Sequence, residues 1–198
     1  GLESLEYRGY DSAGIAVFDI NNTLKVVKSK GRLALLRDKL NHLAEKLEGH
    51  CGIGHTRWAT HGEPSDVNAH PHGTPRVYIV HNGIIENYHE IKDFLVGKSY
   101  AFVSETDTEI AAKLIDYYFV EIGDPTAAMQ KALAHLAGSY GIGAIFAGHP
   151  DTIYAARKDS PLIIALSDNG NFIASDIPAV LKYTNRYFRI DEGELAIV

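Results

Sequence analysis

The chain contains a single cysteine and a single methionine, and no apolar run is long enough to cross a membrane. One cysteine excludes an internal disulfide and fits a reducing compartment. The formal charge of -6 is mildly acidic, and no run of Lys and Arg suggests a nucleic-acid surface. No signal-peptide pattern opens the sequence. We therefore expect a cytoplasmic protein with no membrane or nucleic-acid partner.

The composition is that of an ordinary globular protein. Hydrophobic residues make up 45% of the 198 positions and charged residues 22%, which argues against disorder. There is no internal repeat, low-complexity stretch or linker. We expect residues 1–198 to form one domain.

Hydrophobic periodicity and turn residues predict an order of elements. Residues 14–20 and 24–29 should be strands around a turn at 21–23, and a helix should run from Leu33 to Leu47 and end at Gly49. Further strands are expected at 51–57 and 76–80, and helices at 87–96, from a capping box Thr106-x-x-Glu109, and from 124 to about 136. The remaining predicted strands are 142–146, 152–156, 162–166, 172–174 and 187–198. Because helices and strands come in blocks, the pattern favours an α+β fold with antiparallel sheets.

Two polar segments follow predicted strands. Arg57 and Trp58, within 55–62, suit either a packed indole with a surface ion pair or a pocket in which the guanidinium binds a carboxylate. Asn82-Gly83 is either a simple turn or a pair of N–H donors for a developing oxyanion. The residues alone leave both choices open.

Two further segments carry charge. Asp107, in 104–109, is either an acid in the first turn of a helix or a partner for a ligand ammonium. Residues 6–14 are polar and contain glycine just before a strand. Together, a carboxylate-binding Arg, an ammonium-binding Asp and an oxyanion hole describe a pocket for an α-amino acid that is cleaved at a side-chain carbonyl.

At this point the sequence resembles a known family. The segments that carry the resemblance are Glu6-Tyr-Arg-Gly-Tyr-Asp-Ser-Ala-Gly14, His55-Thr-Arg-Trp-Ala-Thr-His-Gly62, His81-Asn-Gly-Ile-Ile-Glu-Asn87, Ser104-Glu-Thr-Asp-Thr-Glu109 and Phe172-Ile-Ala-Ser-Asp176. They are similar, in order along nearly the whole chain, to the glutaminase domains of the glucosamine-6-phosphate synthases, which are class II glutamine amidotransferases. The 6–14 segment points most narrowly to that family.

The resemblance implies an N-terminal-nucleophile hydrolase fold, an αββα sandwich of two antiparallel sheets. It implies hydrolysis of L-glutamine to glutamate and ammonia by an N-terminal cysteine, whose α-amino group acts as the base. Ammonia would then reach a sugar isomerase domain of the same protein, where fructose 6-phosphate becomes glucosamine 6-phosphate. No metal or organic cofactor is implied, and the full-length protein is expected to be a homo-oligomer.

The resemblance also implies roles for individual residues. Arg57 would bind the α-carboxylate of glutamine and Asp107 the α-ammonium. Asn82 and Gly83 would form the oxyanion hole. The remaining implied residues are Trp58, Thr60 and His61, which would line or close the pocket, and Arg8, which would lie near the nucleophile.

The sequence departs from the family at its start. It opens with Gly1 near the end of an expected helix, without the family's Cys-Gly-Ile segment. We therefore expect an N-terminally incomplete glutaminase domain, without its isomerase domain, that is inactive as written. Cys51 is interpreted as a buried structural thiol, and the histidines at 55, 61, 70 and 72 lack the partners of a zinc site.

Three possibilities stay open. The chain is either a glutaminase, as the resemblance implies, or a non-catalytic binding module with an amidotransferase fold, an idea that loss of the nucleophile from the gene would support. A glutaminase domain that serves a different acceptor is a further possibility, which the 6–14 segment disfavours. A Met-Cys-Gly start in the gene upstream of Gly1 would favour the enzyme.

Overall fold

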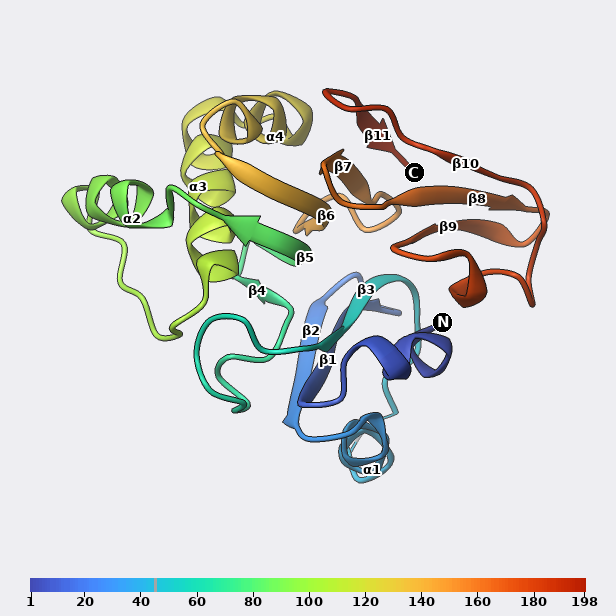
Figure 1. Ribbon diagram of the computed structural model, residues 1–198. Helices are drawn as coiled ribbons and strands as arrows, with labels where there is room; N and C mark the ends of the chain where they lie inside the picture. The colour runs from blue at the N-terminus through green and yellow to red at the C-terminus, as the bar shows by residue number, and fades with distance from the viewer. Residues whose placement is uncertain (45) are drawn as a thin grey trace.

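The structure, a computed structural model, describes residues 1–44 and 46–198. Its strands form three antiparallel sheets (Figure 1). One sheet has the order β2-β1-β3, from β1 (Ser12–Asp19), β2 (Leu24–Lys30) and β3 (Gly49–Arg57). The second has the order β10-β8-β9, from β8 (Ile163–Ser167), β9 (Gly170–Ala174) and β10 (Tyr187–Arg189).

The third sheet has five strands in the order β11-β7-β6-β5-β4. Its strands are β4 (His72–Gly73), β5 (Val77–Ile85), β6 (Gly138–Phe146), β7 (Tyr154–Lys158) and β11 (Leu195–Ile197). The helices are α1 (Leu33–Asn41), α2 (Tyr88–Gly97), α3 (Asp107–Ile122) and α4 (Pro125–Leu133), with 3-10 turns η1 (Leu2–Arg8) and η2 (Ile177–Ala179).

The five-stranded sheet separates two apolar layers. Because strand side chains alternate between faces, Val77 and Ile79 of β5 pack against α2, α3 and α4. Tyr78 and Val80 point the other way and pack with Phe18 of the sheet that holds β1. The β8 sheet packs on the same side, through a cluster that contains Ala155 and Ile164. This large burial of apolar side chains is the main stabilising term of the domain.

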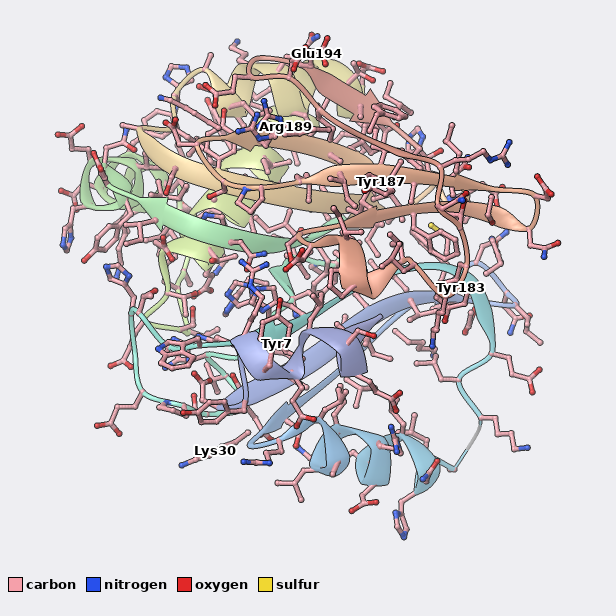
Figure 2. All side chains as sticks on the ribbon, turned by 45° about the vertical axis from the view of Figure 1, so that its right-hand side comes forward. Tyr7, Lys30, Tyr183, Tyr187, Arg189 and Glu194 are labelled. Carbon is pink, nitrogen blue, oxygen red and sulfur yellow. The ribbon has the colours of Figure 1, made fainter. Side chains whose placement is uncertain are left out.

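Short helices form a further layer, on the faces of the β1 and β8 sheets that point away from the five-stranded sheet. Leu33 and Leu36 of α1 pack on Ala13 of β1. η1 and η2 cover the β8 sheet. Tyr7 lies on η1 (Figure 2), and its hydroxyl donates to Asp176 Oδ2 over 2.7 Å. The expected α+β fold with an αββα order of layers is confirmed, with one difference. The layer that faces the five-stranded sheet consists of two separate sheets rather than one.

Several predicted boundaries were wrong. The helix predicted to reach Leu47 ends at Asn41, and Gly49 begins β3 instead of ending the helix. The apolar spacing continued past Asn41, but residues 42–44 and 46–48 form neither helix nor strand. The predicted helix also crossed residue 45, which lies outside the described residues. The strand predicted over 187–198 is two strands in different sheets, because Gly193 turns the chain with a φ of +81°.

The capping box at the start of α3 is half confirmed. Thr106 accepts a hydrogen bond from the Glu109 N–H, as the pattern predicts. The Glu109 carboxylate, however, accepts from the N–H groups of Val103 and Ser104 rather than from that of Thr106. Glu109 therefore fixes the loop that leads into α3, which places Asp107 in the first turn.

Asp116 is a fully buried carboxylate on α3 that joins three parts of the fold. It accepts hydrogen bonds from the Thr74 hydroxyl (2.7 Å), the Arg76 guanidinium (2.8 and 2.6 Å) and the Tyr100 hydroxyl (2.8 Å). Replacing it by alanine would leave these donors without their acceptor. We expect Asp116→Ala to lower the free energy of unfolding by about 2–5 kcal/mol, measured by urea denaturation. Asp93→Ala, at an exposed acid on α2, should change it by no more than about 0.5 kcal/mol; equal effects of the two variants would contradict the assignment.

Candidate active site

A cavity with a volume of about 810 Å³ lies where the three sheets meet. Its walls include all of β3 and β9, each of which is an edge strand of its three-stranded sheet. The cavity contains every residue that the sequence nominated for a site. These are Arg8, Arg57, Trp58, Thr60, His61, Asn82, Gly83 and Asp107.

Arg57 is the last residue of β3 and is almost completely buried. Its Nη2 donates hydrogen bonds to the carbonyl oxygens of His61 and Gly62, the latter at 2.9 Å. Its Nη1 has no hydrogen-bond partner among the described residues, and the nearest carboxylate oxygen, on Asp11, is 3.8 Å away. Burial is the largest influence on the pKa of Arg57 and lowers it. A buried guanidinium with a free N–H beside a cavity is suited to an anionic ligand.

The loop after Arg57 carries three more cavity residues. Trp58 is 60% exposed, and its indole contacts the Tyr10 ring edge-on, with centroids 5.4 Å apart. Thr60 and His61 also line the cavity, and the His61 ring contacts that of Tyr88. This exposure rules out the interpretation of Trp58 as a packed core residue.

Asp107 is the first residue of α3 and is buried. Its Oδ2 accepts a hydrogen bond from the Ile85 N–H over 2.8 Å, so the side chain ties the start of the helix to the end of β5. Thr108 donates to Oδ1 only weakly, at 3.4 Å. The carboxylate is thus both a first-turn acid of a helix and a negative group on the cavity wall.

Asn82 and Gly83 lie inside β5, and the expectation that they form a turn or follow a strand was wrong. The strand continues to Ile85 because Asn82 and Gly83 pair with Gly141 and Tyr140 of β6. Gly83 has a φ of +125°, and a Cβ there would lie 2.1 Å from the Ser139 carbonyl oxygen. Only glycine fits this backbone.

Arg8 connects the cavity to the turns that cover it. It is the last residue of η1, and its Nη1 lies 3.4 Å from both the Ser175 carbonyl and Asp176 Oδ2. The side chain remains partly exposed. Arg8 therefore holds η1 against the segment that follows β9.

Four histidines form a group beside the cavity, and most of them had been considered from the sequence only as zinc ligands. His55, which is half-buried, and the buried His70 and His81 line the cavity. The buried His72 contacts the His70 ring without lining the cavity. Desolvation is the main influence on each pKa, which falls to about 4 for His55 and about 3 for His72, and the pKa values of the other two are also lowered. Across residues 1–44 and 46–198, no group of three His, Cys, Asp or Glu side chains has an arrangement that could hold a metal ion.

The signal that identifies His55 as a site residue was present in the sequence. Alternate residues of a strand share a face, so His55 lies on the same face of β3 as Arg57. In β5 the same alternation places the adjacent residues His81 and Asn82 on opposite faces of the strand. His81 turns toward α3, where its Nδ1 is 3.0 Å from the Thr108 hydroxyl, while Asn82 turns toward β3.

The histidines make a pH dependence testable. An unfolded imidazole binds a proton as the pH falls below about 6.5, whereas His72 does so in the folded chain only near pH 3. The unfolded state therefore binds more protons between these values, and stability falls as the pH falls. Between pH 7 and pH 5 we expect His55 and His72 each to remove on the order of 2 kcal/mol of unfolding free energy.

Substitution of His72 isolates one of these contributions. His72→Gln should reduce the loss of stability between pH 7 and pH 5, measured by urea denaturation at each pH. His89→Gln, at an exposed histidine of α2, should leave that loss unchanged. An unaltered pH dependence in His72→Gln would show that His72 is protonated in the folded chain.

Comparisons with known proteins give consistent results. A family model described as a glutamine amidotransferase domain matches residues 55–182. A protein from Caldanaerobacter subterraneus subsp. tengcongensis, named glutamine--fructose-6-phosphate aminotransferase [isomerizing], is 52% identical over 202 residues, which cover 100% of this chain and 32% of that protein. The protein of the same name from Escherichia coli K12 is 46% identical over 196 residues, 99% of this chain and 32% of its own length. The chain thus spans about a third of these relatives.

Two solved structures are similar over nearly the whole chain. One is the glutamine phosphoribosylpyrophosphate amidotransferase from B. subtilis complexed with ADP and GMP, with a TM-score of 0.82 and 25% identity over 99% of this chain and 42% of that one. The other, described as the allosteric regulatory enzyme of purine biosynthesis, has a TM-score of 0.83 at the same identity and coverage. No helix among the described residues is long and apolar enough to span a membrane.

Proposed function

Because the chain belongs to the glutamine amidotransferase family, we propose that its cavity binds L-glutamine and hydrolyses the side-chain amide to glutamate and ammonia. The observation that carries this proposal is the presence of two opposite charges in the lining of one cavity. The guanidinium of Arg57 and the carboxylate of Asp107 each have capacity for a further partner. A free amino acid is a zwitterion and requires both.

The two ends of the ligand are assigned by charge. The Arg57 Nη1 would donate to the α-carboxylate, and Asp107 Oδ1, which has only a weak bond from Thr108, would accept from the α-ammonium. Both groups are buried, so each interaction is stronger than its counterpart in water. Trp58, Thr60 and His61 would line the pocket around the ligand, and the side-chain amide would then extend toward Asn82 and Gly83.

Asn82 and Gly83 are suited to hold the carbonyl oxygen of that amide. Attack on the carbonyl places negative charge on its oxygen, and preorganised N–H donors stabilise that charge. The absence of a side chain at Gly83 lets a ligand approach the backbone closely. We assign the oxyanion hole to these two residues.

Cys51 is a poor candidate for the nucleophile, although it lines the same cavity. Burial and the nearby Asp151 both raise the pKa of its thiol, which disfavours the reactive thiolate. We propose that the nucleophile is an N-terminal cysteine outside residues 1–198, near Arg8, as the resemblance implies. Residues 1–198 would then be the incomplete glutaminase domain of a longer protein.

The names of the relatives support a proposal for the reaction of the whole protein. We propose that the ammonia is used to convert fructose 6-phosphate to glucosamine 6-phosphate, in a sugar isomerase domain of the same cytoplasmic, homo-oligomeric protein. Identities of 46–52% to proteins named for that reaction support this acceptor. A phosphoribosyl acceptor is the weaker candidate, because it rests on a structural similarity to an amidotransferase that is only 25% identical in sequence. Intact Arg57 and Asp107 argue against a non-catalytic module.

Substitution of the two charged residues tests ligand binding. In the complete protein we expect Arg57→Ala and Asp107→Ala each to lower kcat/KM for glutamine more than tenfold, since an unpaired buried ligand charge costs about 2–5 kcal/mol. Glutamate release measures this effect. Sugar amination driven by added ammonium should survive, because free ammonia does not need the pocket.

Asp107→Asn separates the two roles of the acid. Asparagine keeps an oxygen for the Ile85 N–H but loses the charge. If Asp107 binds the ammonium, Asn and Ala should both raise the KM for glutamine. A normal KM in Asp107→Asn would mean that Asp107 only starts the helix, and an equal loss of ammonium-driven activity would indicate a damaged fold.

A second experiment concerns the nucleophile. A polypeptide of residues 1–198 should release no glutamate, because Cys51 is not activated. The same residues preceded by the family's segment from Cys-Gly-Ile onward should release it, and Cys51→Ala should not reduce that activity. Glutamate release by residues 1–198 that disappears in Cys51→Ala would overturn the assignment.

A further inference from the structure

Asn82 does not stand alone in the cavity wall. Its Oδ1 lies 2.8 Å from Nε2 of His55, which belongs to β3 in the opposite sheet. The register of both strands fixes this approach: β3 is paired to β1 through Gly14 and His55, and β5 is paired to β6 through Asn82 and Gly141. The contact therefore joins two sheets across the site.

The tautomer of His55 decides which group Asn82 presents. If Nε2 carries the proton, it donates to the carbonyl oxygen of the Asn82 amide, and the NH₂ end is directed elsewhere. If Nδ1 carries the proton, Nε2 becomes an acceptor, and Asn82 must turn its NH₂ toward it and its oxygen away. Only the first arrangement leaves the Asn82 NH₂ free to donate to an anionic oxygen. In the second, the Asn82 carbonyl oxygen would face that anionic oxygen and repel it.

The surroundings of His55 favour the first arrangement. Its Nδ1 is buried and has no hydrogen-bond partner among the described residues. An unpaired acceptor at that place is less unfavourable than an unpaired N–H donor. The ring of His70 stacks on the His55 ring, with centroids 4.2 Å apart and an interplanar angle of 20°, which restricts rotation. Desolvation also lowers the pKa of His55 to about 4, so the ring is neutral near pH 7.

We propose that His55 is a positioning residue for the oxyanion hole. Its Nε2–H holds the Asn82 oxygen, so that the Asn82 NH₂ is oriented toward the scissile amide of the substrate before substrate arrives. This inference rests on the proposed glutaminase function, because it gives the reason why Asn82 is a donor at all. His55 touches neither substrate nor nucleophile in this scheme.

Two substitutions distinguish positioning from mere packing. The side-chain amide of glutamine reaches the place of Nε2, whereas that of asparagine reaches only the place of Nδ1. In the complete protein we expect His55→Asn to lower kcat for glutamine hydrolysis roughly 10- to 100-fold, somewhat less than outright removal of an oxyanion donor, with KM changed less than about threefold. His55→Gln should recover most of the lost kcat.

His72 supplies the matched control. It is buried in the same histidine group, but its Nε2 contacts the Thr106 hydroxyl at 3.1 Å and the Asn68 carbonyl at 3.3 Å, and it does not line the cavity. His72→Asn and His72→Gln should not differ in kcat. If the two His55 variants were equally impaired, His55 would be a packing residue and the proposal would fail.

A double-mutant comparison and a spectroscopic measurement complete the test. In an Asn82→Ala background, His55→Asn should cause no further loss of kcat, because its effect passes through Asn82; an undiminished loss would overturn the proposal. In ¹⁵N NMR spectra at pH 7, His55 should be protonated on Nε2 only, and protonation on Nδ1 would also overturn it. If the wild-type protein failed to hydrolyse glutamine, the proposed function would be wrong, while the NMR spectrum would still decide the tautomer.

Discussion

The geometry of the candidate site depends on the hydrogen bond from the Ile85 N–H to the Asp107 carboxylate. This bond connects the last residue of β5 to the first residue of α3, two elements that also share the largest apolar cluster. Asn82 and Gly83 precede Ile85 in β5, and Asp107 is the acceptor of this hydrogen bond. The negative group and the two proposed oxyanion donors therefore occupy one rigid unit, whose geometry is fixed by packing that extends far from the cavity.

The second rigid unit is the sheet that holds β3. It brings His55 and Arg57 to the same face of one strand, and the cavity forms where this sheet meets β5. Polar side chains can be buried here because most of them are paired across the sheets or with loop carbonyls. The atoms left without a partner among the described residues, Arg57 Nη1 and His55 Nδ1, both belong to this face. The site is thus a contact between two preformed surfaces rather than a single flexible loop.

The sequence predicted the elements better than their ends. Strong periodicity identified α3, and the Asp-Pro start identified α4, because these signals are local. The end of α1 could not be predicted, since its leucine spacing continued beyond Asn41 while the backbone turned toward β3. Asn82-Gly83 looked like a turn because that dipeptide is typical of one; pairing with β6, a contact more than fifty residues away, keeps it in a strand. The site residues were grouped by resemblance, whereas the His55–Asn82 contact depended on the register of two sheets, which no local pattern specifies.

The two carbonyl oxygens that bind Arg57 come from the loop that carries Trp58, Thr60 and His61. One guanidinium therefore fixes the path of the loop through Nη2, while its Nη1 has no hydrogen-bond partner among the described residues and the residue as a whole lines the cavity. If an anion binds Arg57, as proposed, its binding and the order of this loop are thermodynamically linked. In that case an anion that stabilises the loop on binding is bound more weakly when the loop is loosened, and the coupling free energy is the same in both directions.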